Sequence, residues 1–227
     1  MRLNFGDGAL TRLAFVFALL AASPLEARVL DLHSEIRVEK SGELRVTERI
    51  TVEAGKGTLR LERELPHEAR VVELVRDGHA EGYALDGARL LAVGAPNEGR
   101  HLYQVTYRAP RRIAFLGDHD ALHWRLSGGE RMTAEVILPS SVPARQIKLE
   151  ASGGEYQSLL RDGRAAFRTQ APIALVVRFP KGVVAEPGVG QRAAWFFSDY
   201  FGLFLVAVLL SLSALVLHLI RGQGRNS

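Results

Sequence analysis

Most of the chain alternates apolar and polar positions with a period of two residues. Apolar residues stand at Ile36 and Val38 before the turn-forming segment Lys40–Glu43, and at Leu44 and Val46 after it. Successive side chains of a β-strand point to opposite faces of the sheet, so the intervening polar residues would form a solvated face. The pattern therefore predicts a β-hairpin of two strands joined by a glycine turn.

The same alternation recurs at short intervals after this hairpin. Further strands are predicted at Thr58–Leu65, Val71–Arg76, Ala88–Val93, His101–Tyr107, Leu122–Leu126, Thr133–Leu138, Gln146–Ala151, Ala165–Thr169 and Ile173–Phe179. Turn formers such as Asp77-Gly78 and Gly153-Gly154 separate them. Short strands at even spacing are typical of a β-sandwich or barrel. We expect an all-β domain built as an antiparallel β-sandwich.

A long apolar stretch near the C-terminus, Trp195–Ile220, departs from this alternation. Its length suits a helix that crosses a bilayer, and the aromatic residues at its start are typical of a membrane interface. Arg221 and Arg225 follow it, and basic residues close to a span remain on the cytoplasmic side. We expect one C-terminal transmembrane α-helix in this stretch.

A shorter apolar run, Leu13–Ala22, lies near the N-terminus and follows Arg2 and Arg12. As a helix it would rise only about 15 Å, roughly half the thickness of a bilayer core. The positive start, the short apolar centre and the small residue Ala27 are typical of a secretory signal peptide. Both ends of the chain thus predict a single-pass type I protein whose β-domain lies outside the cytoplasm.

These elements predict the organisation of the whole chain. It comprises a signal peptide (1–27), an extracytoplasmic β-sandwich domain (28–180), a linker (181–194), a transmembrane helix (195–220) and a cytoplasmic tail (221–227). The chain has no Asn-x-Ser/Thr glycosylation acceptor, in keeping with a bacterial envelope protein. We expect it in the bacterial cytoplasmic (inner) membrane, with a periplasmic domain.

The amino-acid composition limits which partners and which kinds of chemistry are expected. Lys and Arg number 29 against 25 Asp and Glu, and the arginines are interleaved with glutamates. Because nucleic-acid-binding domains cluster their basic residues, no nucleic-acid partner is expected. The chain has no cysteine, which excludes disulfides and thiol chemistry, and it has no Gly-x-Ser-x-Gly motif. The expected partners are the membrane and a protein of the envelope.

The segment Asp118–Trp124 holds the candidate chemistry. His119 and His123 are four residues apart with Asp120 beside the first, which resembles a zinc-protease motif with Asp in place of Glu. On a helix this spacing would place both imidazoles on one face, and Asp118 is a further candidate ligand. The flanking glycines and the strand-like residues that follow oppose such a helix.

A loop that enters a strand explains the same residues without a metal. Asp118 and Asp120 can accept backbone N–H bonds, His119 can be held by a carboxylate, and Trp124 can anchor the loop to the core. We therefore expect a structural or ligand-recognition loop made of these residues and His123. No catalytic residue, cofactor or bound metal is expected.

The order of motifs in the β-region resembles that of a known family. The matching segments are Ile36-x-Val38, Gly42-Glu43-Leu44-x-Val46-x-Glu48, Gly57-Thr58-Leu59-Arg60-Leu61 with Arg63 and Pro66, Arg76-Asp77-Gly78, Tyr103-x-Val105-x-Tyr107, Phe115, Asp118-His119-Asp120 with Leu122 and Trp124, Val136-Ile137-Leu138-Pro139, and Phe179-Pro180-Lys181-Gly182. They resemble the N-terminal extracytoplasmic domain of the YciQ-like predicted membrane proteins (domain of unknown function 2207). The resemblance implies an exported, membrane-tethered β-domain with no established activity.

The chain departs from the family pattern at three points. Ala121 stands where the pattern has an acidic residue, and His123 stands where it has an aromatic residue. Longer members continue into further membrane helices, so this chain is expected to be a short version that ends after one. An aromatic residue at position 123 has no metal-binding atom, so the resemblance also weighs against a zinc site.

These observations predict a membrane-anchored binding or assembly module of the cell envelope rather than an enzyme. Two alternatives stay open. One is a metal-dependent envelope hydrolase that uses the Asp118-His119-Asp120/His123 cluster. The other is a single-span subunit of a larger membrane complex.

Overall fold

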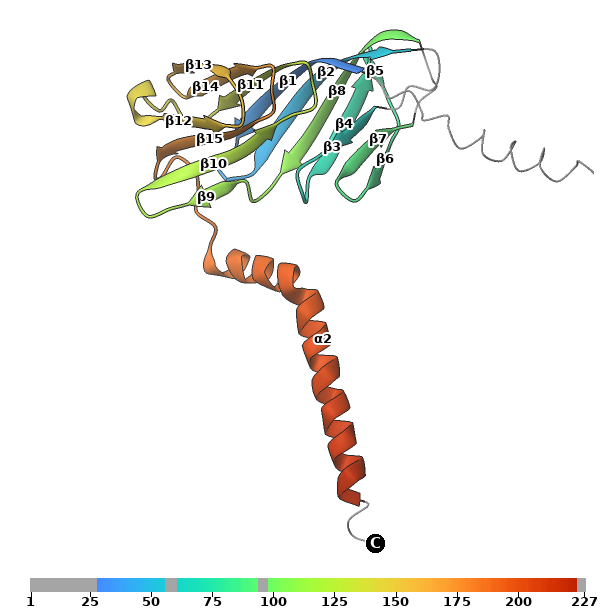
Figure 1. Cartoon of the computed structure of the whole chain (residues 1–227). Helices are drawn as coiled ribbons and strands as arrows, with labels where there is room; N and C mark the ends of the chain where they lie inside the picture. The colour runs from blue at the N-terminus through green and yellow to red at the C-terminus, as the bar shows by residue number, and fades with distance from the viewer. Residues whose placement is uncertain (1–27, 56–60, 94–97, 224–227) are drawn as a thin grey trace, which may run out of the picture. The chain divides into compact units, whose positions relative to one another are not determined.

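The computed structural model of the chain describes residues 28–55, 61–93 and 98–223, except for the side chains of 215–223. The predicted signal peptide lies outside these residues. Two compact units are present, one ending at Ala185 and the other beginning at Glu186. The first is the β-domain and the second contains a single long helix (Figure 1).

The largest sheet of the β-domain has eight strands. Their order is β13 (Tyr156–Arg161), β14 (Arg164–Thr169), β11 (Arg131–Ile137), β1 (Arg28–Val38), β2 (Leu44–Ala54), β8 (Gly99–Ala109), β4 (Arg70–Arg76) and β5 (His79–Ala80). The predicted hairpin is β1 and β2, joined by the turn that contains Gly42. Pairing is antiparallel except between β1 and β11, which run parallel.

Two smaller sheets complete the β-domain (Figure 1). One has the order β12 (Lys148–Ser152), β15 (Ile173–Pro180), β10 (His119–Leu126) and β9 (Ile113–Phe115). The other consists of β3 (Glu62–Glu64), β7 (Arg89–Ala92) and β6 (Tyr83–Asp86). A short 3-10 helix, η1 (Ala144–Gln146), precedes β12. The all-β fold expected from the sequence is confirmed.

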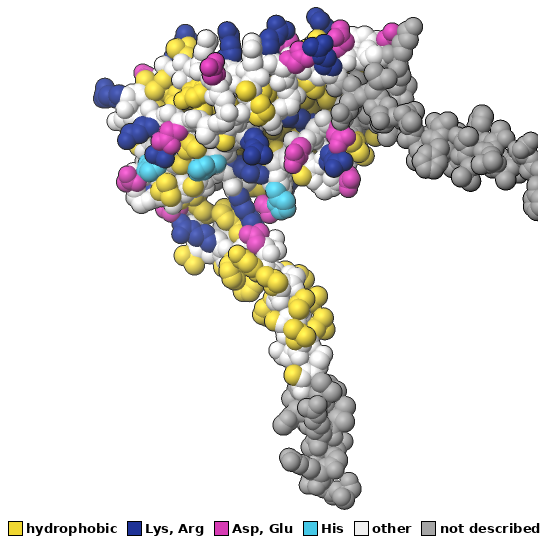
Figure 2. Space-filling view, in the orientation of Figure 1, with side chains coloured by type: hydrophobic (Ala, Val, Ile, Leu, Met, Phe, Trp, Pro, Cys, Tyr) yellow, Lys and Arg dark blue, Asp and Glu magenta, His cyan; other side chains and the backbone are white. Residues whose placement is uncertain are grey.

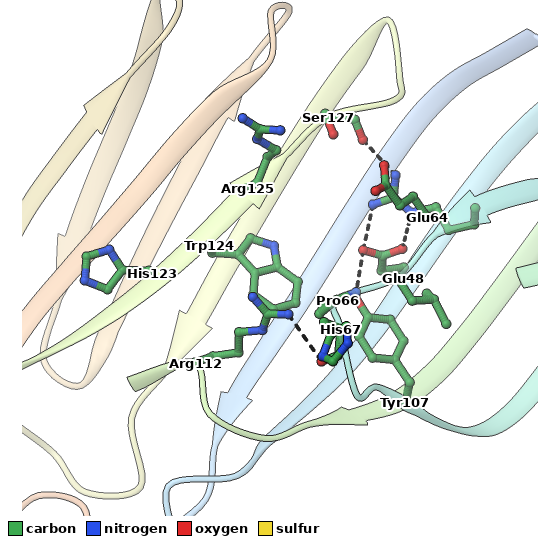
Figure 3. A pocket seen from close by; sticks show the side chains of 12 residues that line it. Glu48, Glu64, Pro66, His67, Tyr107, Arg112, His123, Trp124, Arg125 and Ser127 are labelled. Carbon is green, nitrogen blue, oxygen red and sulfur yellow. Dashed lines mark hydrogen bonds and ion pairs between the residues drawn. The ribbon is translucent and has the colours of Figure 1, made fainter. Parts of the chain in front are cut away.

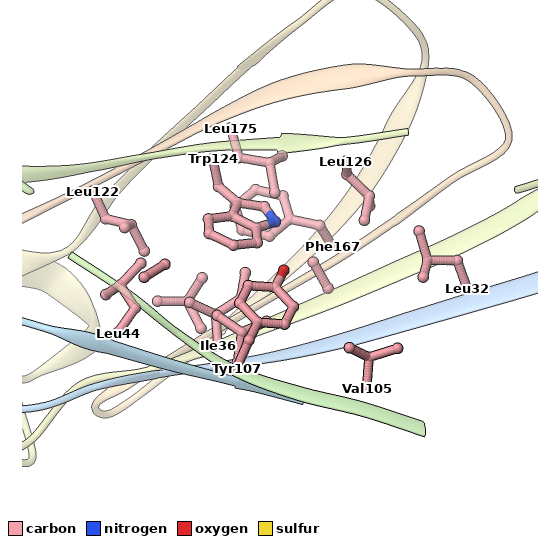
Figure 4. Packing of buried hydrophobic residues seen from close by; sticks show 14 of the residues in the cluster. Leu32, Ile36, Leu44, Val105, Tyr107, Leu122, Trp124, Leu126, Phe167 and Leu175 are labelled. Carbon is pink, nitrogen blue, oxygen red and sulfur yellow. The ribbon is translucent and has the colours of Figure 1, made fainter. Parts of the chain in front are cut away.

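The core lies between the eight-stranded sheet and the sheet that contains β10. Along β2, every second side chain is buried, beginning at Leu44. Leu122, Trp124 and Leu126 of β10 are buried on the facing side, and Figure 4 shows them packed against Ile36 and other core residues. Each fully buried aliphatic side chain of this kind stabilises the fold by about 1.5–3 kcal/mol. A slip of one residue in either strand would expose its whole apolar set, so the alternation fixes the register.

The structure contains strands that the alternation did not predict. In β13 only Leu160 is even partly buried, so its sequence carries no period-two pattern. The strands β5, β6 and β9 are short, from two to four residues, and give too few positions for a pattern. The strand predicted from Gln146 begins instead at Lys148, because residues 144–146 form the 3-10 turn.

The helical unit is α2 (Val189–Gln223). It begins six residues before Trp195, within the segment predicted as a linker. Its part Val189–Ala214 is long and apolar enough to cross a membrane, with a mean hydropathy of 1.8. Figure 2 shows apolar side chains along this part, whereas basic and acidic side chains alternate over the visible face of the β-domain. The limits of the membrane span, 195–220, stay a prediction.

Candidate functional site

The segment that resembles a zinc-protease motif lies on a strand rather than a helix. Residues 119–126 form β10, which is paired with β15 from end to end. Residues four apart on a strand are separated by about 13 Å along its axis, so His119 and His123 do not converge on one ion. Within the described ranges, no group of three or more His, Cys, Asp or Glu side chains could hold a metal.

One ion pair joins the beginning of β10 to the residue that follows β15. Asp120 is 1% exposed, and its Oδ1 lies 2.8 Å from Nζ of Lys181. The neighbouring contact is local: His119 Nδ1 lies 2.6 Å from Asp118 Oδ1, and this hydrogen bond is the main cause that lowers the pKa of Asp118. Of the residues expected in a loop, Asp118 lies in a short bend at 117–118, whereas residues 119–124 belong to β10.

Trp124 lies on the same buried face of β10 as Asp120 and Leu122 and projects toward the interior, where it lines a cleft of about 270 Å³ (Figure 3). The cleft opens between β10 and the segment that follows β3. Its lining residues are Glu48, Arg63, Glu64, Leu65, Pro66, His67, Tyr107, Arg112, His123, Trp124, Arg125 and Ser127. Of the five residues predicted as a recognition loop, His123 and Trp124 line it, whereas Asp118, His119 and Asp120 do not.

A buried ion pair forms one wall of the cleft. Glu48 is 1% exposed and accepts two hydrogen bonds from Arg63, from Nε to Oε2 at 2.7 Å and from Nη2 to Oε1 at 2.8 Å. The hydroxyls of Tyr107 and Ser34 also donate to Oε1, at 3.1 and 3.4 Å. Both carboxylate oxygens are therefore engaged, which is the condition under which a charge can remain buried.

The turn after β10 is shaped to receive the Arg63 side chain. Arg63 Nη1 donates to the carbonyl oxygen of Ser127 at 2.8 Å. The next residue, Gly128, has φ +94°, and a Cβ there would lie 2.9 Å from Nη1. A glycine is thus required both by the backbone conformation and by the approach of the guanidinium.

The electrostatics of this wall favour a charged Arg63 and a neutral Tyr107. Burial is the largest single influence on the pKa of Arg63 and lowers it, but the charge of Glu48 and the hydrogen bonds to it, with smaller contributions from Tyr107 and Glu64, together raise the pKa overall. Burial, and then the charge of Glu48, raise the pKa of Tyr107 well above its ordinary value. Tyr107 therefore stays a hydrogen-bond donor to Glu48 at any physiological pH.

The raised pKa of Tyr107 makes the folded state sensitive to alkali. Above pH about 10 the phenol ionises in the unfolded chain but not in the folded one, so the unfolded state binds fewer protons. Stability from this group is complete below pH about 10 and decreases as the pH rises beyond it. In the wild-type protein this dependence lowers the free energy of unfolding by up to about 1.4 kcal/mol per pH unit. We expect the Tyr107→Phe variant to lack this contribution. Denaturant unfolding of both full-length proteins in micelles at several alkaline pH values measures it, and equal slopes would contradict the assignment.

The opposite side of the cleft carries two buried donors without a partner. Arg112 Nε and Trp124 Nε1 form no hydrogen bond to any described residue, and both belong to residues that line the cleft. Trp124 is only 7% exposed. The carbonyl of Arg112 accepts from the His123 N–H at 3.1 Å, which fixes Arg112 beside Trp124. A buried donor left unpaired costs about 1–3 kcal/mol, so these groups are expected to bind something in the cleft.

Ten of the twelve cleft residues were not among the sites predicted from the sequence, and the four that matter most here are Glu48, Arg63, Tyr107 and Arg112. One of them carried a recognisable signal. Glu48 falls on the buried parity of β2, between Val46 and Ile50, where the alternation otherwise places apolar residues. A charge at such a position needs a buried partner, which marks it as part of a polar site.

Comparison with known proteins finds one matching family and several solved structures of low sequence identity. Residues 28–171 match a family described as the N-terminal domain of a predicted membrane protein (DUF2207). No curated protein sequence matches the chain. Among solved structures, native yeast LTA4 hydrolase gives a TM-score of 0.49 at 12% identity, over 67% of this chain and 29% of that one. An M1 zinc metallopeptidase from Deinococcus radiodurans gives 0.45 at 16% identity, over 78% and 54%. The chain thus spans about a third to a half of those structures.

Proposed function

The chain belongs to the DUF2207 family of predicted membrane proteins, and from this membership we propose that its β-domain is a ligand-binding module of the cell envelope. The binding site is the cleft beside Trp124. A protein or another envelope molecule is held there at the membrane surface.

The observation that carries this proposal is the pair of unpartnered donors in the cleft. The nitrogen atoms Arg112 Nε and Trp124 Nε1 are buried, and the cleft beside them is large enough for a small chemical group. Natural folds satisfy almost all buried polar atoms, and exceptions cluster where a ligand or an ordered water binds. The Glu48–Arg63 ion pair, to which Tyr107 also donates, forms the wall of the cleft beside these donors without any ligand.

Binding suits these residues better than catalysis does. A general base must reach the proton that it abstracts, and Glu48 is 1% exposed with its carboxylate held by Arg63. Arg112 and Trp124 are not proton-transfer groups at ordinary pH. The two histidines that line the cleft, His67 and His123, are exposed at its rim.

The second part of the proposal concerns attachment of the β-domain to a membrane and the side on which it lies. The family match and the apolar part of α2 both support anchoring of the β-domain to a membrane. In the proposed arrangement, the β-domain faces away from the cytoplasm of a bacterial cell. The arginines that follow the predicted span and the predicted signal peptide support this orientation.

Thiol footprinting tests the proposal without requiring the identity of the ligand, because the chain has no native cysteine. The full-length His67→Cys variant carries its thiol at the rim of the cleft. The Ser152→Cys variant carries one on the exposed end of β12, outside the cleft lining. Both are treated with a membrane-impermeant maleimide, once in native membranes and once after purification in detergent.

The expected result is protection confined to the cleft. The His67→Cys variant should react several-fold more slowly in native membranes than after purification, while the Ser152→Cys variant reacts at similar rates in both. Equal changes in the two variants would overturn the proposed function. Failure of the Ser152→Cys variant, whose thiol lies outside the cleft, to react in intact spheroplasts would overturn the proposed orientation.

A further inference from the structure

We propose that the group bound in the cleft is an oxyanion, a carboxylate or a phosphate, held by Arg112 and Trp124. This inference rests on the proposed function, and it names the chemistry of the ligand. Three properties of the cleft carry it: the kind of polar atom left free, the distribution of charge, and the size of the space.

The buried polar atoms of the cleft that lack a partner, Arg112 Nε and Trp124 Nε1, are donors. An indole N–H donates only, and a guanidinium has five donors and no acceptor. Three acceptors beside them are engaged: Glu48 by Arg63 and Tyr107, the Ser127 carbonyl by Arg63, and the His67 carbonyl by Arg112 Nη2 at 3.4 Å. A ligand that pairs with the two buried donors must therefore present acceptors, which disfavours ammonium groups and other donor-only ligands.

The charge of the cleft selects an anion among acceptors. Three arginines (Arg63, Arg112 and Arg125) and two glutamates (Glu48 and Glu64) line it. Arg63 and Glu48 neutralise each other, and Glu64 is exposed at the rim. Arg112 is left as the partly buried positive charge, and hydrogen bonds from a guanidinium to an anion are about twice as strong as those between neutral groups.

The size of the space limits what enters. A volume of about 270 Å³ lies just below the range of pockets that enclose whole small molecules. It admits one charged end group with its first atoms, while the rest of a larger ligand would lie outside. The cleft therefore binds the charged end of a larger ligand rather than enclosing a complete small molecule.

The indole proton of Trp124 is the direct reporter of this binding. The chain has two tryptophans, Trp124 and Trp195, so the Trp195→Phe variant gives a single indole N–H signal. The full-length variant is labelled with ¹⁵N and kept in detergent micelles at constant ionic strength. It is then titrated separately with acetate, inorganic phosphate and neutral acetamide, with chloride as the balancing anion.

The expected result is a saturable shift of the Trp124 indole signal with at least one of the two oxyanions. Dissociation constants in the millimolar range are expected, as is usual for so small a ligand. Acetamide should bind at least tenfold more weakly. The stronger of acetate and phosphate then identifies the end group as a carboxylate or a phosphate.

Two variants distinguish binding of the anion in the cleft from a general attraction of anions to the protein. Arg112→Gln in the same background should weaken the oxyanion at least tenfold. Arg168→Gln, at an exposed position on β14 outside the cleft, should leave it unchanged. An indole signal that neither anion moves, a non-saturable shift, or equal binding of acetamide would overturn the inference and leave water as the partner of these donors.

The thiol footprinting and the indole titration can give a negative result independently of each other. Protection of the His67→Cys variant in membranes without oxyanion binding would retain the binding function and reject the oxyanion. Oxyanion binding without protection in membranes would reject the proposed function and retain the chemistry of the cleft.

Discussion

Replacing Arg63 by methionine is expected to destabilise the β-domain by about 3–5 kcal/mol, the range for loss of one partner of a buried ion pair. The substitution keeps much of the aliphatic volume but leaves the Glu48 carboxylate, 1% exposed, without its main counter-charge. Tyr107 and Ser34 alone offer only neutral donors. Denaturant unfolding of the full-length protein in micelles, followed by the fluorescence of Trp124 in the Trp195→Phe background, measures the change.

A double variant and an exposed pair provide the controls. Arg63→Met leaves the Glu48 charge without its counter-charge, and Glu48→Gln removes that charge. The double variant should therefore recover part of the lost stability. Arg164 on β14 pairs with Glu135 at 3.0 Å but is 57% exposed, so Arg164→Met should cost no more than about 1 kcal/mol. If Arg63→Met costs no more than Arg164→Met, the buried pair does not have the role assigned to it.

Trp124→Ala is expected to cost a similar amount, about 3–5 kcal/mol, for a different reason. The indole is 7% exposed and fills the space between the two main sheets, where Figures 3 and 4 show it facing Tyr107. Alanine leaves a cavity that two paired sheets cannot close by collapsing. The same unfolding experiment measures the loss, with the β-sheet circular dichroism signal as the probe.

Trp124→Phe is the matched control. Phenylalanine keeps an aromatic ring in the core and removes only part of the volume together with the N–H, so it should cost less than about 1.5 kcal/mol. The Trp124 Nε1–H has no partner among the residues that the structure describes, so its loss carries no further cost. A cost equal to that of Trp124→Ala would show that the N–H is already paired in the folded protein and would contradict the free donor.

The sequence predicted strands only where the two faces of a strand differ. In β2 the buried and exposed positions alternate without a break, and the hairpin with β1 was predicted at the turn where the structure places it. In β13 both faces meet solvent, so hydrophobicity carried no signal. The parallel pairing of β1 with β11 could not be predicted either, because the alternation of one strand does not specify its neighbours.

Two of the residues predicted as a recognition loop, His123 and Trp124, line the cleft, and the other three do not. The interest of His119 and His123 came from their spacing in sequence, which brings two side chains together only on a helix. Trp124 was expected to anchor the motif to the core, and it does lie there, beside the cleft. The other cleft residues come from four separate segments, and their convergence depends on how three sheets pack. Among them, only the acidic residue at the buried position 48 was recognisable from the sequence.

The parallel pairing of β1 sets a limit on how fast the domain can fold. Asp31 lies opposite Arg131, so one edge of this central strand stays open until about a hundred residues more have been synthesised. Chains dominated by such distant pairings fold in milliseconds to seconds, because loop closure precedes any gain in contacts. Until then, the open edge of β1 exposes Asp31, Glu35 and Arg37, charges of the kind that discourage edge-to-edge aggregation. The charged side chain of Asp31 thus discourages aggregation of the nascent chain before it pairs with Arg131 in the finished sheet.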